Sequence, residues 1–306
     1  MEWEVKLIEW IQSSLGVLCV SLGRFFSFVG GETGLMVLIV IVLFCWKKKA
    51  GQRLALIIAS LHAWLSMIKA IVKRPRPYAQ YPDRVEAYAP VDPESPATDL
   101  VAQGYSFPSM HSAAVASAYF SLAKEVNKKW FWILAAALTF LVGFFRVATG
   151  NHYPTDVLAG WILGFVTLGF FELLDKYVKK EWLRHLILFL SALPGLIFVR
   201  TAEYYTSLGL LIGAIFAIPF ERKYVDYQET KSVIAMILRT LCAFAIYFGL
   251  NKLLKLPFGE EFLSSDNLAA LLVRTGRYTI IMFVIMAVYP LVFPLFEKIG
   301  KNKETY

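Results

Sequence analysis

Residues 130–147 read WFWILAAALTFLVGFFRV, an apolar run whose only charge is Arg146 near its end. A membrane-spanning helix needs about 20 mostly apolar residues, so this run is predicted to cross a bilayer. Eight further stretches have the same character, at 32–46, 53–72, 108–123, 156–174, 183–199, 204–220, 232–250 and 268–296. The sequence therefore predicts an all-α, polytopic membrane helix bundle with about eight or nine spans.

Composition agrees with this class, because 58% of the 306 residues are hydrophobic and 15% are aromatic. The net charge of +8 comes from basic clusters near 47–53, 124–129, 176–184, 222–231 and 298–303. These clusters fall on every second connection, as the positive-inside tendency places cytoplasmic loops. The charge is therefore interpreted as a topology signal, and nucleic acid is not expected as a partner. The alternate connections, 73–107, 148–155, 200–203 and 251–267, are predicted to face outward.

The chain is predicted to have three segments. Residues 1–30 mix acidic side chains with Trp3 and Trp10, which indicates an interfacial helix, although the segment could also span. Residues 31–180 carry every polar stretch of chemical interest and are expected to form a catalytic bundle. Residues 181–306 are expected to add membrane helices of unknown role. No pattern indicates an oligomeric state.

The first polar stretch runs from Lys69 to Pro77 and gathers four cations, Lys69, Lys73, Arg74 and Arg76. Two prolines end the preceding helix and stiffen the segment. An arginine fork can bind two phosphate oxygens, and a lysine adds a compact charge. The alternative is a cluster of basic side chains at the membrane interface, which is the commoner use of such residues.

The second stretch is Pro108-Ser109-Met110-His111, and Pro108 is predicted to lie in the first turn of a helix. The free amides of Ser109, Met110 and His111 would then lie at a positive helix end, where anions bind. His111 carries an imidazole suited to proton transfer near neutral pH. Taken alone, the stretch also fits a histidine at a membrane interface.

The third stretch runs from Arg146 through His152 to Asp156, where Pro154 is predicted to begin another helix. A carboxylate in a first turn points back toward the residues before the helix. Asp156 is therefore predicted to reach the ring of His152 and to fix its tautomer. The alternative is that Asp156 only caps its own helix.

In order and spacing, these three stretches resemble the signature of the type 2 phosphatidic acid phosphatase family. Lys69 and Arg76-Pro77 correspond to its Lys, six residues, Arg-Pro; residues 108–111 correspond to its Pro-Ser-Gly-His. Arg146, His152 and Asp156 correspond to its Ser-Arg, five residues, His, three residues, Asp. Two positions depart from the pattern: Met110 replaces the glycine and Phe145 replaces the serine. Reduced or redirected activity is expected from these departures.

The resemblance implies an integral-membrane lipid phosphate phosphatase that works through a phosphohistidine on His152. By the same resemblance, Asp156 orients His152, and His111 protonates the departing alkoxide. The oxygens of the phosphate would be held by a group of four residues, Lys69, Arg76, Ser109 and Arg146. Because no carboxylate cluster has metal-ligand spacing, we expect neither a metal nor another cofactor.

The substrate implied by the resemblance is a lipid phosphate or pyrophosphate, such as phosphatidic acid, phosphatidylglycerol phosphate, an isoprenoid pyrophosphate or a sphingoid phosphate. The site is expected at the outer face of a plasma or inner membrane. Met110, Arg274 and Arg277 are candidate substrate-binding residues, and snorkelling or internal ion pairs are the alternative for the two arginines. Two other functions stay open: a lipid-linked phosphotransferase, and a non-enzymatic lipid transporter or binding protein on the same scaffold.

Overall fold

The computed structural model describes residues 2–301, which form helices and connections without a β-strand. Seven helices within this range are long and apolar enough to cross a membrane, and the count is eight if α1 and α2 form one span bent by 110°. The prediction of a polytopic helical bundle is confirmed. The predicted spans at 32–46 and 108–123 correspond to shorter helices.

The chain divides into two compact units, described separately below. The first comprises the residues up to Leu35 together with Leu65–Tyr177, and the second comprises Met36–Trp64 and the chain from Val178 onward. This division does not test the three segments predicted from the sequence. It does place the N-terminal segment in the same unit as all three polar stretches.

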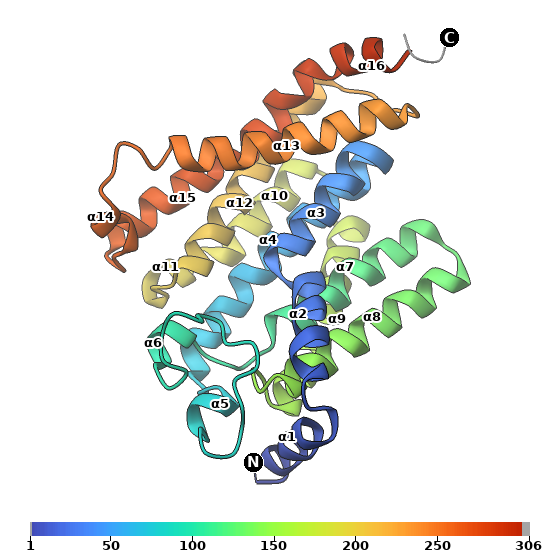
Figure 1. Ribbon diagram of the computed structural model, residues 1–306. Helices are drawn as coiled ribbons and strands as arrows, with labels where there is room; N and C mark the ends of the chain where they lie inside the picture. The colour runs from blue at the N-terminus through green and yellow to red at the C-terminus, as the bar shows by residue number, and fades with distance from the viewer. Residues whose placement is uncertain (1, 302–306) are drawn as a thin grey trace. The chain divides into compact units, whose positions relative to one another are not determined.

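The first unit contains seven complete helices (Figure 1): α1 (Glu2–Leu15), α2 (Leu18–Gly30), α5 (Pro77–Gln80), α6 (Leu100–Gln103), α7 (Met110–Val126), α8 (Lys129–Ala148) and α9 (Pro154–Tyr177). It also holds the start of α3 (Glu32–Ile41) and the last part of α4 (Lys48–Val72). Helices α7, α8 and α9 lie side by side, and α2 packs on α8.

Small residues allow α7 and α9 to approach closely. A Cβ atom on Gly160 would lie 2.5 Å from the carbonyl oxygen of Ser109, and one on Gly164 would lie 2.5 Å from that of Ala113. This four-residue spacing of glycines lets membrane helices pack backbone against backbone. It places the first turns of α7 and α9, with their polar stretches, next to each other.

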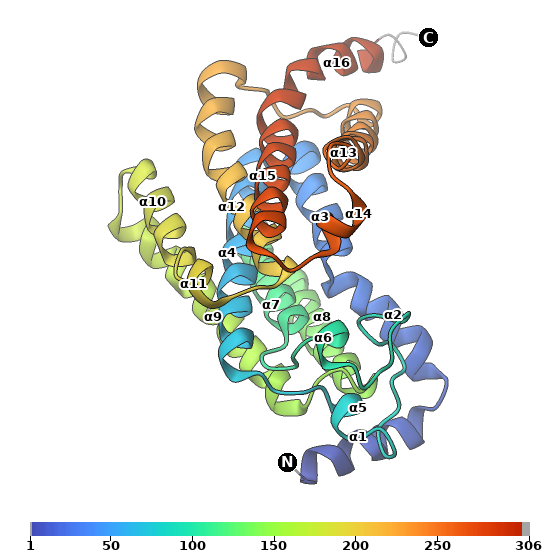
Figure 2. The ribbon, with the colours of Figure 1, turned by 90° about the vertical axis from the view of Figure 1, so that its left-hand side faces the viewer.

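The N-terminal helix α1 is amphipathic and packs on the same region of the first unit. Val5, Ile8 and Ile11 lie in a buried apolar cluster with Phe145 and Tyr153. Trp3 and Trp10 are 56% and 65% exposed on the other face. Figure 2 shows α1 near the connection that carries α5 and α6. The predicted interfacial position of this segment stays a prediction.

The second unit contains α10 (Glu181–Ala192), α11 (Gly195–Phe198), α12 (Ala202–Phe220), α13 (Val233–Leu253), α14 (Glu260–Ser264), α15 (Leu268–Phe283) and α16 (Phe293–Lys301). Short π-helical or 3₁₀ turns extend the helices at η1 (Val42–Trp46), η2 (Glu221–Val225), η3 (Val284–Val288) and η4 (Tyr289–Val292). Helices α12 and α15 again meet through glycines, because a Cβ on Gly209 would lie 2.4 Å from the carbonyl oxygen of Thr275. The buried Arg239 of α13 pairs with Glu297 at 3.0 Å.

Candidate active site

The three polar stretches meet within the first unit. Ser109 N donates to the Asp156 carbonyl at 3.0 Å, which joins the second stretch to the third, and Arg76 Nη1 lies 3.4 Å from His152 Nε2, which joins the first to the third. Within the third stretch, His152 Nδ1 lies 3.6 Å from Asp156 Oδ2. Lys69 lies in the last turn of α4, Arg146 lies in the last turn of α8, and Asp156 lies in the first turn of α9. These three residues thus lie where a helix begins or ends.

His152 is buried at the centre of this cluster, with 2% of its surface exposed. Its two ring nitrogens have different neighbours: Nε2 faces Arg76 and Nδ1 faces Asp156. Nδ1 forms no hydrogen bond, since 3.6 Å exceeds the usual length. The predicted proximity of Asp156 and His152 is therefore present, and the hydrogen bond itself is not.

The electrostatic setting favours a neutral His152. Burial lowers its pKa well below the ordinary value, because an imidazolium loses its hydration there. The positive charges of Arg76, Arg146 and Lys69, with a smaller effect from His111, lower the pKa of His152 further. An unprotonated imidazole is the form that can act as a nucleophile or a base.

The cations predicted to bind phosphate are held by neutral oxygens. Arg76 donates to the carbonyls of Gln103 at 2.7 Å and Asn151 at 3.1 Å, and Lys69 donates to that of Tyr105 at 2.6 Å. Arg146 is 4% exposed and donates to Ser27 Oγ of α2 at 2.9 Å.

The guanidinium of Arg146 has spare binding capacity. Its Nε is buried without a hydrogen-bond partner, and within the described chain it has no carboxylate partner. A buried cation in this state is costly unless an anion binds beside it. The arrangement can thus accept an anion next to a neutral histidine.

The start of α7 differs from the expectation. The helix begins at Met110, with Ser109 rather than Pro108 at its cap, and Ser109 Oγ accepts a hydrogen bond from Ser112 N. Because Ser109 N already donates to Asp156, its amide is not free, as had been expected. A phosphate-binding role for Ser109 stays a prediction, with this bond against it. Met110 and His111 are half-buried.

The departure at Phe145 has a packing explanation. Its ring stacks on Phe26 of α2, with centroids 4.9 Å apart and planes within 9°. The side chain is 5% exposed and belongs to the apolar cluster that includes α1. At this position the chain therefore uses an aromatic contact that joins α8 to the N-terminal helices. No contact comparably explains Met110.

Three residues that sequence reasoning did not assign to the site support it. Arg74 forms one ion pair with Glu4 of α1 and another with Asp156. Gln103, fully buried, holds the long 81–104 connection through its side chain. Arg74 was visible as one cation of a charged run, but nothing in the sequence marked Glu4 or Gln103. Both are isolated polar residues whose partners lie far along the chain.

Arg274 and Arg277 belong to the second unit, on α15. Arg277 is 5% exposed and donates to Asn251 Oδ1 at 2.6 Å, whereas Arg274 is half-buried. No described contact of either arginine involves a carboxylate. A substrate-binding role for them stays a prediction.

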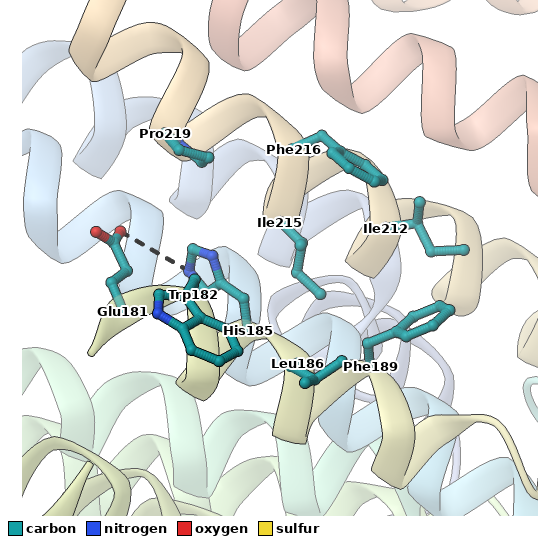
Figure 3. A pocket seen from close by; sticks show the side chains of 9 residues that line it. All are labelled: Glu181, Trp182, His185, Leu186, Phe189, Ile212, Ile215, Phe216 and Pro219. Atoms are coloured by element: carbon teal, nitrogen blue, oxygen red, sulfur yellow. Dashed lines mark ion pairs between the residues drawn. The ribbon is translucent and has the colours of Figure 1, made fainter. Parts of the chain in front are cut away.

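The second unit also has a cavity of about 640 Å³ between α10 and α12. Figure 3 shows apolar side chains of the two helices facing each other across it, with Glu181 and His185 paired at one end. None of the predicted site residues lines this cavity. Among the described residues, no group of three or more His, Cys, Asp or Glu side chains could hold a metal ion.

Comparison with known proteins agrees with the signature. Residues 50–179 match the PAP2 superfamily, and residues 205–301 match the transmembrane extension of PAP2 superfamily phosphatases. Phosphatidylglycerophosphatase B of Bacillus subtilis is 31% identical over 169 residues, covering 50% of this chain and 75% of that protein.

Two other relatives match over shorter regions. Undecaprenyl-diphosphatase of Sulfolobus acidocaldarius is 43% identical over 60 residues, covering 20% of this chain and 29% of that protein. Lipid A 4'-phosphatase of Bacteroides thetaiotaomicron is 34% identical over 82 residues, covering 24% of this chain and 36% of that protein. The matched regions thus span less than two-fifths of these two relatives. No solved structure matches the chain significantly.

Proposed function

Because this chain belongs to the PAP2 superfamily, we propose that it is a membrane phosphatase that hydrolyses a lipid phosphate or pyrophosphate through a phosphohistidine intermediate. The relatives support the reaction class, since each of the three is named as a phosphatase or diphosphatase. The site supports the mechanism, because a buried imidazole lies among cations whose described partners include carbonyl and hydroxyl oxygens.

The observation that carries the proposal is the orientation of His152. Its Nε2 lies 3.4 Å from Arg76, whereas Nδ1 lies on the side of Asp156. A phosphate held by Arg76 would therefore meet Nε2, the nitrogen left free when Nδ1 carries the proton. Asp156 would then stabilise the positive charge that develops on the ring during attack.

In the first step, the Nε2 lone pair of His152 forms a bond to phosphorus as the bond to the leaving oxygen breaks. His111 gives its proton to that oxygen. The product that leaves is an alcohol when the substrate is a monophosphate, and a lipid monophosphate when the substrate is a pyrophosphate. In the second step, water attacks phosphorus, transfers its proton to His111, and releases phosphate and His152. Arg76, Arg146 and Lys69 stabilise the charge on the equatorial oxygens in both steps.

The proposed location is the plasma or inner membrane, with the site on the extracytoplasmic side. This rests on the basic clusters of the alternate connections, which the positive-inside tendency assigns to the cytoplasm. A cysteine introduced at an exposed position of the 83–99 loop should react with an impermeant reagent added outside intact cells. Labelling only from the cytoplasmic side would reverse the proposed orientation.

The roles of the remaining predicted residues belong to the same proposal. We place the catalytic segment within residues 31–180 and assign lipid selection to Met110, Arg274 and Arg277. Replacing both arginines by glutamine should change the ranking of lipid substrates. An unchanged ranking, with unchanged kinetics and stability, would exclude them from binding.

The decisive experiment is phosphate release by the purified protein in detergent, across a panel of lipid phosphates and pyrophosphates. The assay is run with and without a chelator, with His152→Ala as the test variant and His185→Gln as the matched control. We expect the rate of phosphate release to be the same with and without the chelator, and to be roughly three orders of magnitude lower in His152→Ala. Transfer of the phosphoryl group to an alcohol acceptor instead of water would indicate a transferase. Neither release nor transfer by folded protein would indicate a binding or transport role.

A further inference from the structure

Glu4 of helix α1 is a buried carboxylate placed directly behind the candidate site. It is 2% exposed, and its Oε2 accepts a hydrogen bond from Arg74 Nη2 at 2.9 Å. Its Oε1 accepts two more from Thr155, from the hydroxyl at 2.6 Å and from the amide at 3.2 Å. Thr155 immediately precedes Asp156, so Glu4 holds the first turn of α9.

Arg74 connects Glu4 with Asp156. Its Nη1 donates to Asp156 Oδ1 at 2.6 Å and to the Thr155 hydroxyl at 2.7 Å. The guanidinium lies 3.8 Å above the ring of Tyr153. One guanidinium is thus shared between two buried carboxylates and is kept in place by an aromatic ring.

The sharing determines how much negative charge Asp156 presents to His152. The cluster contains two carboxylates and one guanidinium, so its formal charge is −1. If Glu4 were neutral, Arg74 would pair with Asp156 alone and would largely compensate its charge. Charges act strongly on each other in a buried site, so this change would weaken Asp156 as a partner for the imidazole.

We propose that Glu4, which lies outside the residues 50–179 matched to the family, is a positioning residue that acts through Arg74 on Asp156 and thereby on His152. In its kinetic consequences this inference rests on the proposed function. Its structural consequence, the state of the His152 ring, can be measured independently of catalysis. On this basis, helix α1 contributes a positioning residue to the site.

The competing explanation is that Glu4 only fixes α1 to the rest of the unit. The chain offers a matched control, because Glu9 of the same helix pairs with Arg84 at 2.6 Å on the exposed surface, away from Asp156. Glu9→Gln removes one carboxylate–arginine pair from α1, as Glu4→Gln does. Only Glu4→Gln changes the charge that surrounds Asp156.

The test compares Glu4→Gln and Glu9→Gln by kinetics and by ¹⁵N NMR of the imidazole rings in detergent. The chain has only 4 histidines, so the signal of His152 can be assigned with variants that each lack one histidine. We expect the Nδ1–H tautomer of His152 in the unaltered protein, because Nδ1 faces Asp156. In Glu4→Gln we expect a mixture of tautomers, a kcat lowered roughly 10- to 100-fold and a KM changed little, as for partners that orient a functional histidine. Glu9→Gln should match the unaltered protein in all three.

Each outcome separates the two hypotheses. Equal effects of the two variants on kcat and on the His152 signal would overturn the positioning role. No phosphate release by the unaltered protein, with a tautomer change confined to Glu4→Gln, would reject the proposed function and keep the positioning role. Should Glu4→Gln fail to fold, Glu4→Asp keeps a buried carboxylate but draws it away from Arg74, so it weakens the sharing of Arg74 that the proposal requires. An unchanged His152 signal and kcat in a folded Glu4→Asp would then count against the proposal.

Discussion

Nδ1 of His152 lies 3.6 Å from Oδ2 of Asp156, and the same oxygen accepts a hydrogen bond from Tyr153 N at 2.8 Å. Its other oxygen, Oδ1, accepts a hydrogen bond from Arg74, so the carboxylate is held by two groups other than His152. The distance exceeds the usual hydrogen-bond length of about 3 Å by only a few tenths of an ångström. Catalytic hydrogen bonds are often long without substrate and shorten when it binds.

Asp156→Asn tests whether this relationship matters for catalysis. The amide oxygen can still accept from Tyr153, but it has no charge with which to stabilise an imidazolium. We expect kcat to fall roughly 10³- to 10⁴-fold, as in other carboxylate–histidine pairs. Phosphate release is the measurement, and Asp92→Asn, in the 81–104 connection, should remain within about 2-fold because the described bonds of its side chain go to Glu94 N and Ser95 Oγ, which are not site residues. A residual activity above a tenth would contradict the orienting role.

His111→Ala tests the proposed proton donor through the leaving group. Departing alkoxides need a proton, whereas a nitrophenolate leaves without one. Because kcat/KM covers the steps up to the departure of the leaving group and not the later attack of water, it isolates the proton donation. We therefore expect kcat/KM of His111→Ala to fall roughly 10²- to 10⁴-fold on a lipid monophosphate and less than about 10-fold on an aryl phosphate.

His152→Ala supplies the contrast, because a nucleophile is needed with either leaving group. It should lose activity on both substrates to a similar extent. Equal losses by His111→Ala on the two substrates would show that His111 does not donate the proton.

The sequence predicted the fold class and the meeting of the three stretches for clear physical reasons. Apolar runs of span length leave the backbone no alternative to helices in a membrane. The prolines and the charged residues then lie at the run ends, where Lys69, Arg146 and Asp156 are observed. Spacing within one stretch, such as His152 to Asp156, also transfers directly to three dimensions.

What the sequence did not predict depends on contacts between distant segments. Glu4 and Arg74 are 70 positions apart, and Gln12 reaches the Ala148 carbonyl from 136 positions away. Such pairs leave no periodicity or motif in a single sequence. The expectation that Ser109 N would be free failed for the same reason, since the bond to Asp156 depends on the close packing of α7 and α9.

Gln103 gives a prediction about the long 81–104 connection. Its Oε1 accepts from Tyr78 Oη, Val91 N and Asp92 N, and its Nε2 donates to the Asp92 carbonyl. Gln103→Leu removes these bonds, each contributing about 0.5–1.5 kcal/mol, and leaves buried polar groups unpaired. We expect local unfolding, seen as faster proteolysis within 81–102, and weaker substrate binding, because the backbone of Gln103 positions Arg76.

Asp99→Asn is the matched control for this connection. It retains a side-chain oxygen that can cap α6 and should leave proteolysis unchanged. If proteolysis within 81–102 is no faster in Gln103→Leu than in Asp99→Asn, the connection is held by other contacts.

The last prediction concerns pH. Burial and then the charges of Arg76, Arg146 and Lys69 hold the pKa of His152 below its ordinary value of about 6.5. His152 therefore stays neutral as pH falls through 6.5. Because kcat/KM reports the free enzyme, its acid limb should lie well below pH 6.5.

The substrate phosphate itself titrates near pH 6, so the limb must be assigned. We expect the His152 limb to keep its position when a lipid monophosphate is replaced by a substrate of different phosphate pKa. Arg76→Gln removes a positive charge beside the ring, which raises the pKa of His152 and should move the limb toward neutral pH. A limb that follows the substrate and ignores Arg76→Gln would belong to the substrate. A limb near 6.5 that is insensitive to both changes would mean that His152 is solvated, which contradicts a buried nucleophile.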